Sequence, residues 1–170
     1  RTAMTEDQRS APALGSREAG ARPSELRAPH REVDAKGVIE ATSRLFKHES
    51  FCLTDLKQVG QPIVYASTEL ADLTGYPAAD LEGRGLGFLM KNDTDQEGEK
   101  AVREAVESGR PTTVLLRSWR ADGSLFWSEQ RHYPVHDARG DATHLLTVVR
   151  DVSDQVHAES AQAASQELSD

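Results

Sequence analysis

The sequence predicts an α+β fold in which a run of five strands is preceded and followed by helices. Five segments rich in β-branched and aromatic residues have the length of ordinary strands and are separated by turn residues. Other segments carry apolar residues at helical spacing. An Asp122-Gly123 turn joins two of the longest strand segments, which makes these two strands antiparallel neighbours.

The N-terminal part of the chain divides into two regions. Residues 1–32 have almost no apolar side chains, so they cannot offset the entropy of ordering, and we expect a flexible arm. Residues 33–49 predict an amphipathic helix from Asp34 or Ala35 to Lys47. Its apolar face needs a partner, either the sheet of the same domain or a second chain. The side chains at helical spacing are Val38, Ile39, Thr42, Leu45 and Phe46.

Two strands and two short helices are expected next. The strands are residues 51–55 and 61–66, and the helices are residues 68–74 and 78–81. A turn through Val59 and Gly60 joins the strands. Ser67 is a favourable first cap for the first helix, and Gly75 ends it.

The stretch from Gly83 to Asp95 is central to the chain. Its glycines allow tight turns, and its apolar segment, residues 88–90, is placed to pack inward. Thr94 and Glu97 form a capping box, which predicts a helix over residues 94–108. The helix presents Val102, Ala105 and Val106 to the interior.

Three long strands and a final helix complete the expected elements. The strands are residues 112–120, 125–136 and 142–150, joined by turns at 121–124 and 137–141. Residues from Val156 to about Glu167 are rich in Ala and Gln and have few large apolar side chains. Their helicity should therefore depend on a partner or on a following domain.

Several of these segments resemble the light-oxygen-voltage (LOV) branch of the PAS family. Residues 51–76 are similar to the strand and short-helix segment of that family, and 151–154 resembles the motif that leads into its signalling helix. The resemblance implies a PAS fold, a five-stranded antiparallel sheet with short helices on one face and flanking N- and C-terminal helices. It places a PAS/LOV-like domain at 50–151 and a signalling or linker helix at 152–170. The signature residues that match are Gly83, Arg84, Phe88, Leu89, Thr94 and Asp95.

The chain departs from the LOV pattern at the positions that hold and attack flavin. Leu86 stands in place of the reactive cysteine, so the resemblance implies no cysteinyl-flavin photochemistry. Ser118 and Ser128 replace asparagines that contact the ring, and Gln130 replaces an apolar wall residue. The expected ligand pocket comprises Cys52, Thr54, Gly85, Leu86, Gly87, Met90, Arg103, Leu116, Ser118, Ser128, Gln130, His132, Thr147 and Val149.

Flavin binding is expected to be weak or absent, with FMN as the alternative. Buried flavin atoms left without hydrogen bonds would cost ~1–3 kcal/mol each. Arg103 is the one phosphate-binding arginine that stays at a matching position. The resemblance also implies no haem, because haem-binding PAS domains commonly use a histidine on the helix that corresponds to residues 94–108, and this chain has none there.

Cys52 and three of the histidines each have a structural and a functional interpretation. Cys52 could react with a ligand or sense oxidants, but a lone buried cysteine usually acts as a small hydrophobe. His132, His136 and His144 could suggest a metal, but no acidic partner is placed to complete a site. We expect structural roles and no metal.

The sheet face opposite the pocket predicts an interface. It is too apolar to be left in water, so either the N-terminal helix covers it or it forms a dimer seam. The two interpretations are compatible, and we expect a homodimer or a heterodimer with another PAS/LOV domain. The residues are Leu115, Trp119, Trp127, Tyr133, Leu146 and Val148.

Composition and motifs argue against several classes of function. The 170 residues carry a net charge of −8, which disfavours nucleic-acid binding. No run approaches the roughly 18 apolar residues of a membrane span, so we expect a soluble, cytoplasmic protein. We see no nucleophile–base pair, paired carboxylates or phosphate loop, and we do not expect an enzyme. The predicted function is a LOV-like sensor and dimerisation module in signal transduction. The alternative is a cysteine-less flavin photoreceptor that signals through flavin reduction.

Overall fold

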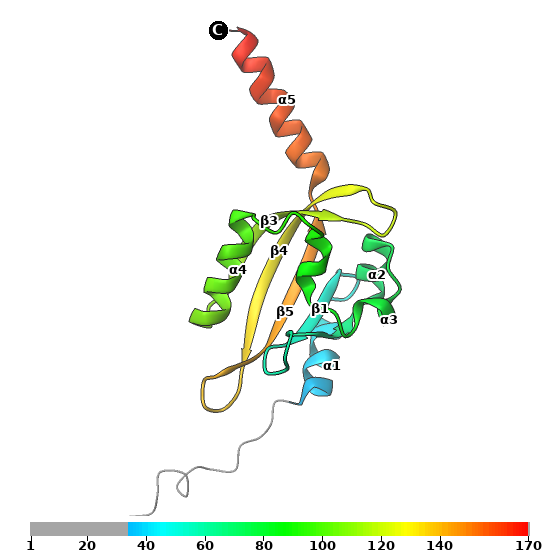
Figure 1. Cartoon of the computed structure of the whole chain (residues 1–170), viewed down its shortest axis with the longest axis vertical. Helices are drawn as coiled ribbons and strands as arrows, with labels where there is room; N and C mark the ends of the chain where they lie inside the picture. Colours follow the sequence, from blue (N-terminus) through cyan, green and yellow to red (C-terminus); the bar gives the residue numbers. More distant parts are fainter. Residues whose placement is uncertain (1–33, 170) are drawn as a thin grey trace, which may run out of the picture. The chain divides into compact units, whose positions relative to one another are not determined.

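The computed structural model describes residues 34–169, and the predicted arm at residues 1–32 lies outside the described residues. One five-stranded antiparallel sheet organises the described part of the chain, with strand order β2-β1-β5-β4-β3 (Figure 1). The last strand therefore lies at the centre, between the first and the fourth. The strands are β1 (Phe51–Asp55), β2 (Ile63–Ala66), β3 (Thr112–Trp119), β4 (Leu125–His136) and β5 (Ala142–Asp151).

Short helices pack on the inner face of this sheet. They are α2 (Thr68–Thr74), α3 (Ala78–Leu81), the 3₁₀ helix η1 (Leu86–Met90) and α4 (Glu97–Ser108). The predicted caps of α2 are confirmed. The Ser67 side chain accepts from the Leu70 backbone N–H, and Gly75 adopts the left-handed conformation with φ of 75°.

The predicted start of α4 is wrong. The helix begins at Glu97, after a Gln96 cap residue whose side chain makes no capping bond, and Thr94 is exposed. Gln96 is buried and bonds across to β3 instead: its amide oxygen accepts from the Arg117 N–H at 2.8 Å, and its amide nitrogen donates to the Arg117 carbonyl at 3.1 Å. These bonds hold the segment before α4 against the sheet, so the helix begins later than the capping box predicts.

The helix α1 (Ala35–Leu45) covers part of the outer face of the sheet. The helix begins where it was expected, and the Asp34 side chain caps it by accepting from the Lys36 N–H, but it ends at Leu45, two residues before the predicted end at Lys47. Side chains of α1 and Phe46 pack on a buried cluster formed by Phe51, Leu53, Leu146 and Val148. Leu45, which helical spacing assigns to this apolar face, is 80% exposed at the end of the helix, so that assignment is wrong.

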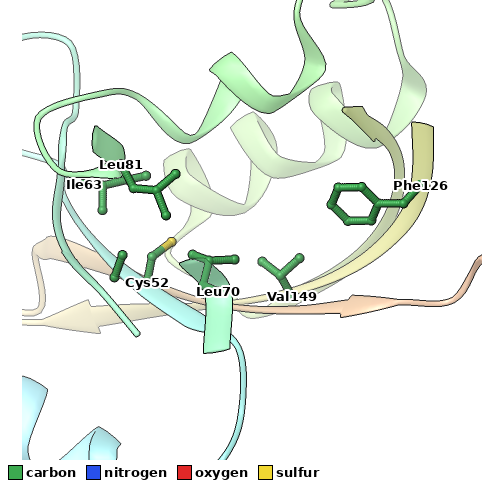
Figure 2. Close-up of a cluster of buried hydrophobic side chains, with 7 residues drawn as sticks. Cys52, Ile63, Leu70, Leu81, Phe126 and Val149 are labelled. Carbon is green, nitrogen blue, oxygen red and sulfur yellow. The ribbon is translucent and has the colours of Figure 1, made fainter. Parts of the chain in front are cut away.

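The main core lies between the inner face and α2 and α3 (Figure 2). It joins side chains of β1, β2, β4 and β5 to those of the short helices. Its fully or nearly fully buried members are Cys52, Ile63, Ala66, Leu70, Leu81, Phe126 and Val149. A smaller buried cluster, formed by Met90, Val114 and Leu116, packs against Ala101 and Val102 of α4.

The helix α5 (Ser153–Ser169) leaves the end of β5 (Figure 1). None of its described residues is buried, and only its first turn is tied to the sheet. The Ser153 hydroxyl accepts from the Trp127 N–H at 2.9 Å, and Arg120 pairs with Asp151 at 2.5 Å. The thin apolar stripe of this segment is consistent with its exposure.

No helix among residues 34–169 is both long enough and apolar enough to cross a membrane.

Candidate functional site

A cavity of about 460 Å³ lies between the inner face of the sheet, η1 and α4. Its walls are largely apolar. Leu56, Leu86, Leu89, Val102, Val106, Leu116 and Leu145 supply branched side chains, and Met90 adds a flexible one. The volume falls within the range of ~300–1,000 Å³ that is usual for small-molecule sites.

The structure brings together many of the expected pocket residues and places others beyond the cavity wall. The residues that line the cavity are Thr54, Gly85, Leu86, Gly87, Met90, Arg103, Leu116, Gln130 and His132. Those that do not line it are Cys52, Ser118, Ser128, Thr147 and Val149, and all of these are buried. The strand alternation placed these residues on the correct face, because the second set lies on the same side of the sheet.

The residues at the predicted flavin edge hydrogen-bond to one another. The hydroxyl oxygens of Ser118 and Ser128 are 3.1 Å apart, and the Gln130 amide donates to Ser128 Oγ at 3.0 Å. All three side chains are buried. Their polar groups satisfy one another, so fewer of them are free to hold the edge of a ligand ring.

His132 is fully buried on β4, and one of its ring nitrogens faces no partner. Nδ1 lies 2.9 Å from the Thr147 hydroxyl, whereas Nε2 makes no hydrogen bond. Burial lowers the pKa of His132 from 6.5 to about 4, because the charged imidazolium would lose its hydration. The side chain is therefore neutral at physiological pH and lines the cavity as an uncharged polar group.

Cys52 belongs to the core and not to the cavity wall. It lies between the sheet and the short helices with Leu70, Leu81 and Val149 (Figure 2). Burial raises its pKa to about 12, so the reactive thiolate is scarce. The Thr54 hydroxyl beside the thiol acts in the opposite direction and lowers this pKa, but burial is the larger effect. The environment is that of a small hydrophobe.

An ion pair stands at the α4 wall of the cavity. Arg103 donates to both carboxylate oxygens of Glu99, at 2.7 and 3.0 Å, and Glu99 raises the pKa of Arg103. Glu107 also lines the cavity, one turn further along the helix. Arg103, the only guanidinium among residues 34–169 that lines the cavity, is therefore held by a carboxylate, and a second carboxylate lies on the same wall.

Sequence reasoning missed the acidic residues at this wall. Charged residues on a helix usually form a solvated face, but the spacing of Glu99, Arg103 and Glu107 puts them together on one side of α4. It also missed Gly60 and Gln61, which line the cavity from the loop between β1 and β2. No local signal places a loop against a helix that lies far away in the sequence.

The outer face of the sheet is divided between covered and partly exposed residues. Leu146 and Val148 are buried beneath α1, and Tyr133 contacts Phe46 of the same region. The other three expected interface residues lie on β3 and β4. Leu115 is 45% exposed, and Trp119 and Trp127 are half-buried.

No group of three or more His, Cys, Asp or Glu side chains within residues 34–169 could hold a metal ion. His132 and His144 lie on opposite faces of the sheet, since His132 shares the cavity with Leu145 and His144 is the next residue along β5. What the cavity offers chemically is a largely apolar space with uncharged polar groups on the sheet side and an ion pair and a further carboxylate on the α4 side.

Comparison with known proteins places this geometry among sensory domains. Residues 48–154 match the family described as PAS domain. Phototropin-2 of Oryza sativa subsp. japonica is 32% identical over 127 residues, which are 74% of this chain and 14% of phototropin-2. The blue-light-activated histidine kinase 1 of Erythrobacter litoralis is 33% identical over 107 residues, 63% of this chain and 30% of the kinase. The chain thus spans less than a third of the length of these relatives.

Solved structures of LOV domains are also similar to this chain. A LOV domain whose mechanism was studied with a flavin analogue is 30% identical with a TM-score of 0.64, covering 77% of this chain and 96% of that domain. An RNA-binding LOV receptor is also 30% identical, with a TM-score of 0.68, and the match covers 88% of this chain and 40% of the receptor.

Proposed function

The chain belongs to the PAS domain family, and from that premise we propose that it is a cytoplasmic, LOV-like sensor and dimerisation module that works without cysteinyl-flavin photochemistry. Its relatives include LOV-containing photoreceptors and light-activated kinases, and the match to them covers a sensor domain. The chain itself is proposed to act as the sensing part of such a system and not as a catalyst.

The observation that carries this proposal is the position of the only cysteine. Cys52 is buried in the core with a raised pKa, whereas the cavity is lined at the signature position by Leu86. A cysteinyl adduct needs a thiol that reaches the bound ring. Leu86 has no nucleophile, and Cys52 does not line the cavity.

Two further features argue for weak flavin binding or none. Ser118, Ser128 and Gln130 hydrogen-bond to one another, so a flavin edge would have to break these bonds or leave its own atoms unpaired. Each buried unpaired group costs about 1–3 kcal/mol, and every 1.4 kcal/mol is about a tenfold loss of affinity. The Glu99 carboxylate already holds Arg103, which weakens its attraction for a phosphate.

The second candidate is a flavin-binding photoreceptor that signals through flavin reduction without a cysteine. The relatives of this chain favour the second candidate, since they include phototropins and blue-light-activated histidine kinases. The size of the cavity does not exclude a ring system.

The output is proposed to pass through α5. Its first turn is joined to the sheet by the Trp127–Ser153 hydrogen bond and by the Arg120–Asp151 ion pair, so a change in the sheet reaches the base of the helix. The rest of α5 is exposed and free to contact a partner or a following domain. A protein partner is favoured over nucleic acid, because the net charge of −8 repels phosphates.

The partly exposed side chains of Leu115, Trp119 and Trp127 support self-association through the outer face. Aromatic and aliphatic groups gathered on one face are typical of the core of an interface. A second copy, or a related PAS domain, is the proposed partner.

The test is a visible absorption spectrum of the purified protein together with native mass spectrometry. We expect a colourless protein without the blue absorption band of flavin, and no change on illumination. A flavin band that is bleached by light through reduction would support the second candidate. A reversible cysteinyl adduct would contradict both.

A further inference from the structure

A short segment connects the cavity to the outer face of the sheet around the edge strand β3. It begins after Met90, which lines the cavity and is buried in a cluster with Val114 and Leu116. It ends at Gln96, the residue before α4. We call residues 91–96 the strap.

An ion pair fixes the strap to the outer face. The Asp93 carboxylate accepts from Arg117 Nε at 2.6 Å and from Arg117 Nη2 at 3.0 Å. Arg117 points outward, since its neighbours Leu116 and Ser118 are buried on the inner face and side chains alternate along a strand. A guanidinium that donates to both oxygens of a carboxylate fixes the orientation of the pair as well as its distance.

Arg117 extends this connection to the tryptophans of the outer face. Its guanidinium lies over the Trp127 ring, 5.7 Å from the centroid, and the two residues are paired across β3 and β4. Trp119 lines a hollow together with Met90 and residues 91–93. A movement of the strap would therefore change the surroundings of both half-buried tryptophans.

The strap is held at both ends. The Asp93 N–H donates to the Met90 carbonyl at 3.0 Å. The Gln96 side chain bonds to both backbone groups of Arg117 and donates to the Asp93 carbonyl at 2.7 Å. Between these points Lys91 has a φ of 51° and a ψ of −121°, which glycine adopts easily and other residues rarely. Such a conformation persists where the surroundings impose it, so the strap has little slack.

We propose that the strap passes a change in the filling of the cavity at Met90 to the Asp93–Arg117 pair, and so to Trp127 on the outer face. A ligand that displaces Met90 displaces the strap with it and moves Arg117 relative to the ring. This inference rests on the proposed function, because it names the route by which the cavity of the sensor acts on its proposed interface. Contiguous contacts do not by themselves establish coupling, so the coupling has to be measured.

The two tryptophans of the chain make the outer face its own reporter. Trp119→Phe leaves Trp127 as the single tryptophan. In this background Met90→Ala truncates the side chain that joins the strap to the cavity. We expect a red shift of the Trp127 emission and stronger quenching by acrylamide, because the loosened strap lets Arg117 leave the ring. An unchanged emission would overturn the proposal.

The matched control is Leu56→Ala in the same background. Leu56 lines the same cavity from the loop between β1 and β2, away from the strap. This variant should leave the Trp127 emission unchanged. An equal red shift in the Leu56→Ala and Met90→Ala proteins would mean that general loosening of the core moves the outer face, and the strap would have no special part in it.

A double-mutant cycle tests the far end of the strap. Asp93→Ala removes the carboxylate that holds Arg117, so it should shift the Trp127 emission by itself. Met90→Ala should then add little further shift, because the connection is already cut. Two shifts that add in full would show that Met90 acts on Trp127 without the ion pair, which contradicts the proposed route.

Lys91 tests whether the strap is held without slack. Lys91→Gly and Lys91→Ala both remove the side chain, but only glycine adopts this backbone conformation freely. The glycine variant should therefore melt at a higher temperature than the alanine variant. An alanine variant that melts at the same or a higher temperature would show that the strap is not under strain and would count against the proposal.

Sedimentation separates this inference from the proposed function. The emission is recorded at a dilution at which the chain is monomeric, so a shift reports the strap and not a change in dimerisation. A chain that stays monomeric at every concentration would contradict the proposed self-association, whereas the tryptophan shifts decide the strap in either case.

Discussion

Gly98 of α4 lies directly against Leu116 of β3. A methyl group on Gly98 would come within 2.7 Å of Leu116 Cδ2 and within 2.8 Å of the Leu115 carbonyl oxygen. The missing side chain is thus what lets α4 approach the sheet closely enough to close one side of the cavity, which Leu116 also lines. Nothing in the sequence around Gly98 distinguishes it from an ordinary helix glycine.

Gly98→Ala tests this close approach. In an exposed helix the change would stabilise by roughly 1 kcal/mol. Here the added methyl meets backbone as well as a side chain, and overpacking costs about 1–3 kcal/mol, so we expect a net loss of stability. Urea unfolding followed by tryptophan fluorescence measures it. Lys100→Ala, at an exposed position of the same helix, is the control, and a stabilised Gly98→Ala protein would show that α4 is not tightly seated.

The buried serines predict an order of effects. Ser128 Oγ is shared by Ser118 and Gln130, so Ser128→Ala leaves two polar groups without their partner and should cost ~1–3 kcal/mol. Ser118→Ala should cost less, because the Gln130–Ser128 hydrogen bond remains. The free energies of unfolding of the two variants decide this. Equal losses would mean that Ser128 is not the centre of the network.

Burial of His132 predicts a pH dependence of stability. The unfolded chain takes up a proton near the ordinary pKa of 6.5, whereas the folded protein does so only at a pKa of about 4. The stability is therefore fully present above pH 6.5 and is lost as the pH falls through 6.5 towards 4. His132 should account for about 2 kcal/mol of the loss between about pH 7 and 5.

Urea unfolding at these two pH values measures the effect. His132→Leu should remove it, so the stability of this variant should change less between the two values. His157→Gln, at an exposed position of α5, is the control and should leave the pH dependence as in the wild type. A His132→Leu protein with the wild-type pH dependence would contradict the assignment.

Leu86→Cys tests what the cavity lacks besides a nucleophile. The change puts a thiol on the cavity wall, but the Ser118–Ser128–Gln130 bonds and the Glu99–Arg103 pair remain. We expect no light-induced adduct after incubation with FMN, measured by absorption before and after illumination. Adduct formation in this single variant would show that the chain still holds flavin in a productive position.

Leu115→Glu tests the outer face. It puts a charge at a 45% exposed apolar position on β3, so self-association should weaken about tenfold or more in sedimentation. Val59→Glu changes a fully exposed residue in the loop between β1 and β2 and is the matched control. A Leu115→Glu protein that dimerises like the wild type would exclude this face as the interface.

Local patterns were enough for most elements. Alternation and turn residues predicted all five strands of the described chain, and the predicted caps at Ser67 and Gly75 are present. The start of α4 was predicted wrongly, because the Gln96 side chain bonds to Arg117 of a distant strand and outcompetes the local capping box. Leu45 was misplaced because helical spacing does not show where the sheet below α1 ends.

For the site, the sequence by itself determined which face of each strand looks inward, since side chains alternate with a period of two. That was sufficient to put Thr54, Gln130 and His132 on one side of the sheet. Only the tertiary structure decided which of the inward residues hydrogen-bond to one another and which line the cavity. Hydrogen bonds between strands, and the seat of α4 on Leu116, depend on distances between segments far apart in the chain, and no local pattern encodes them.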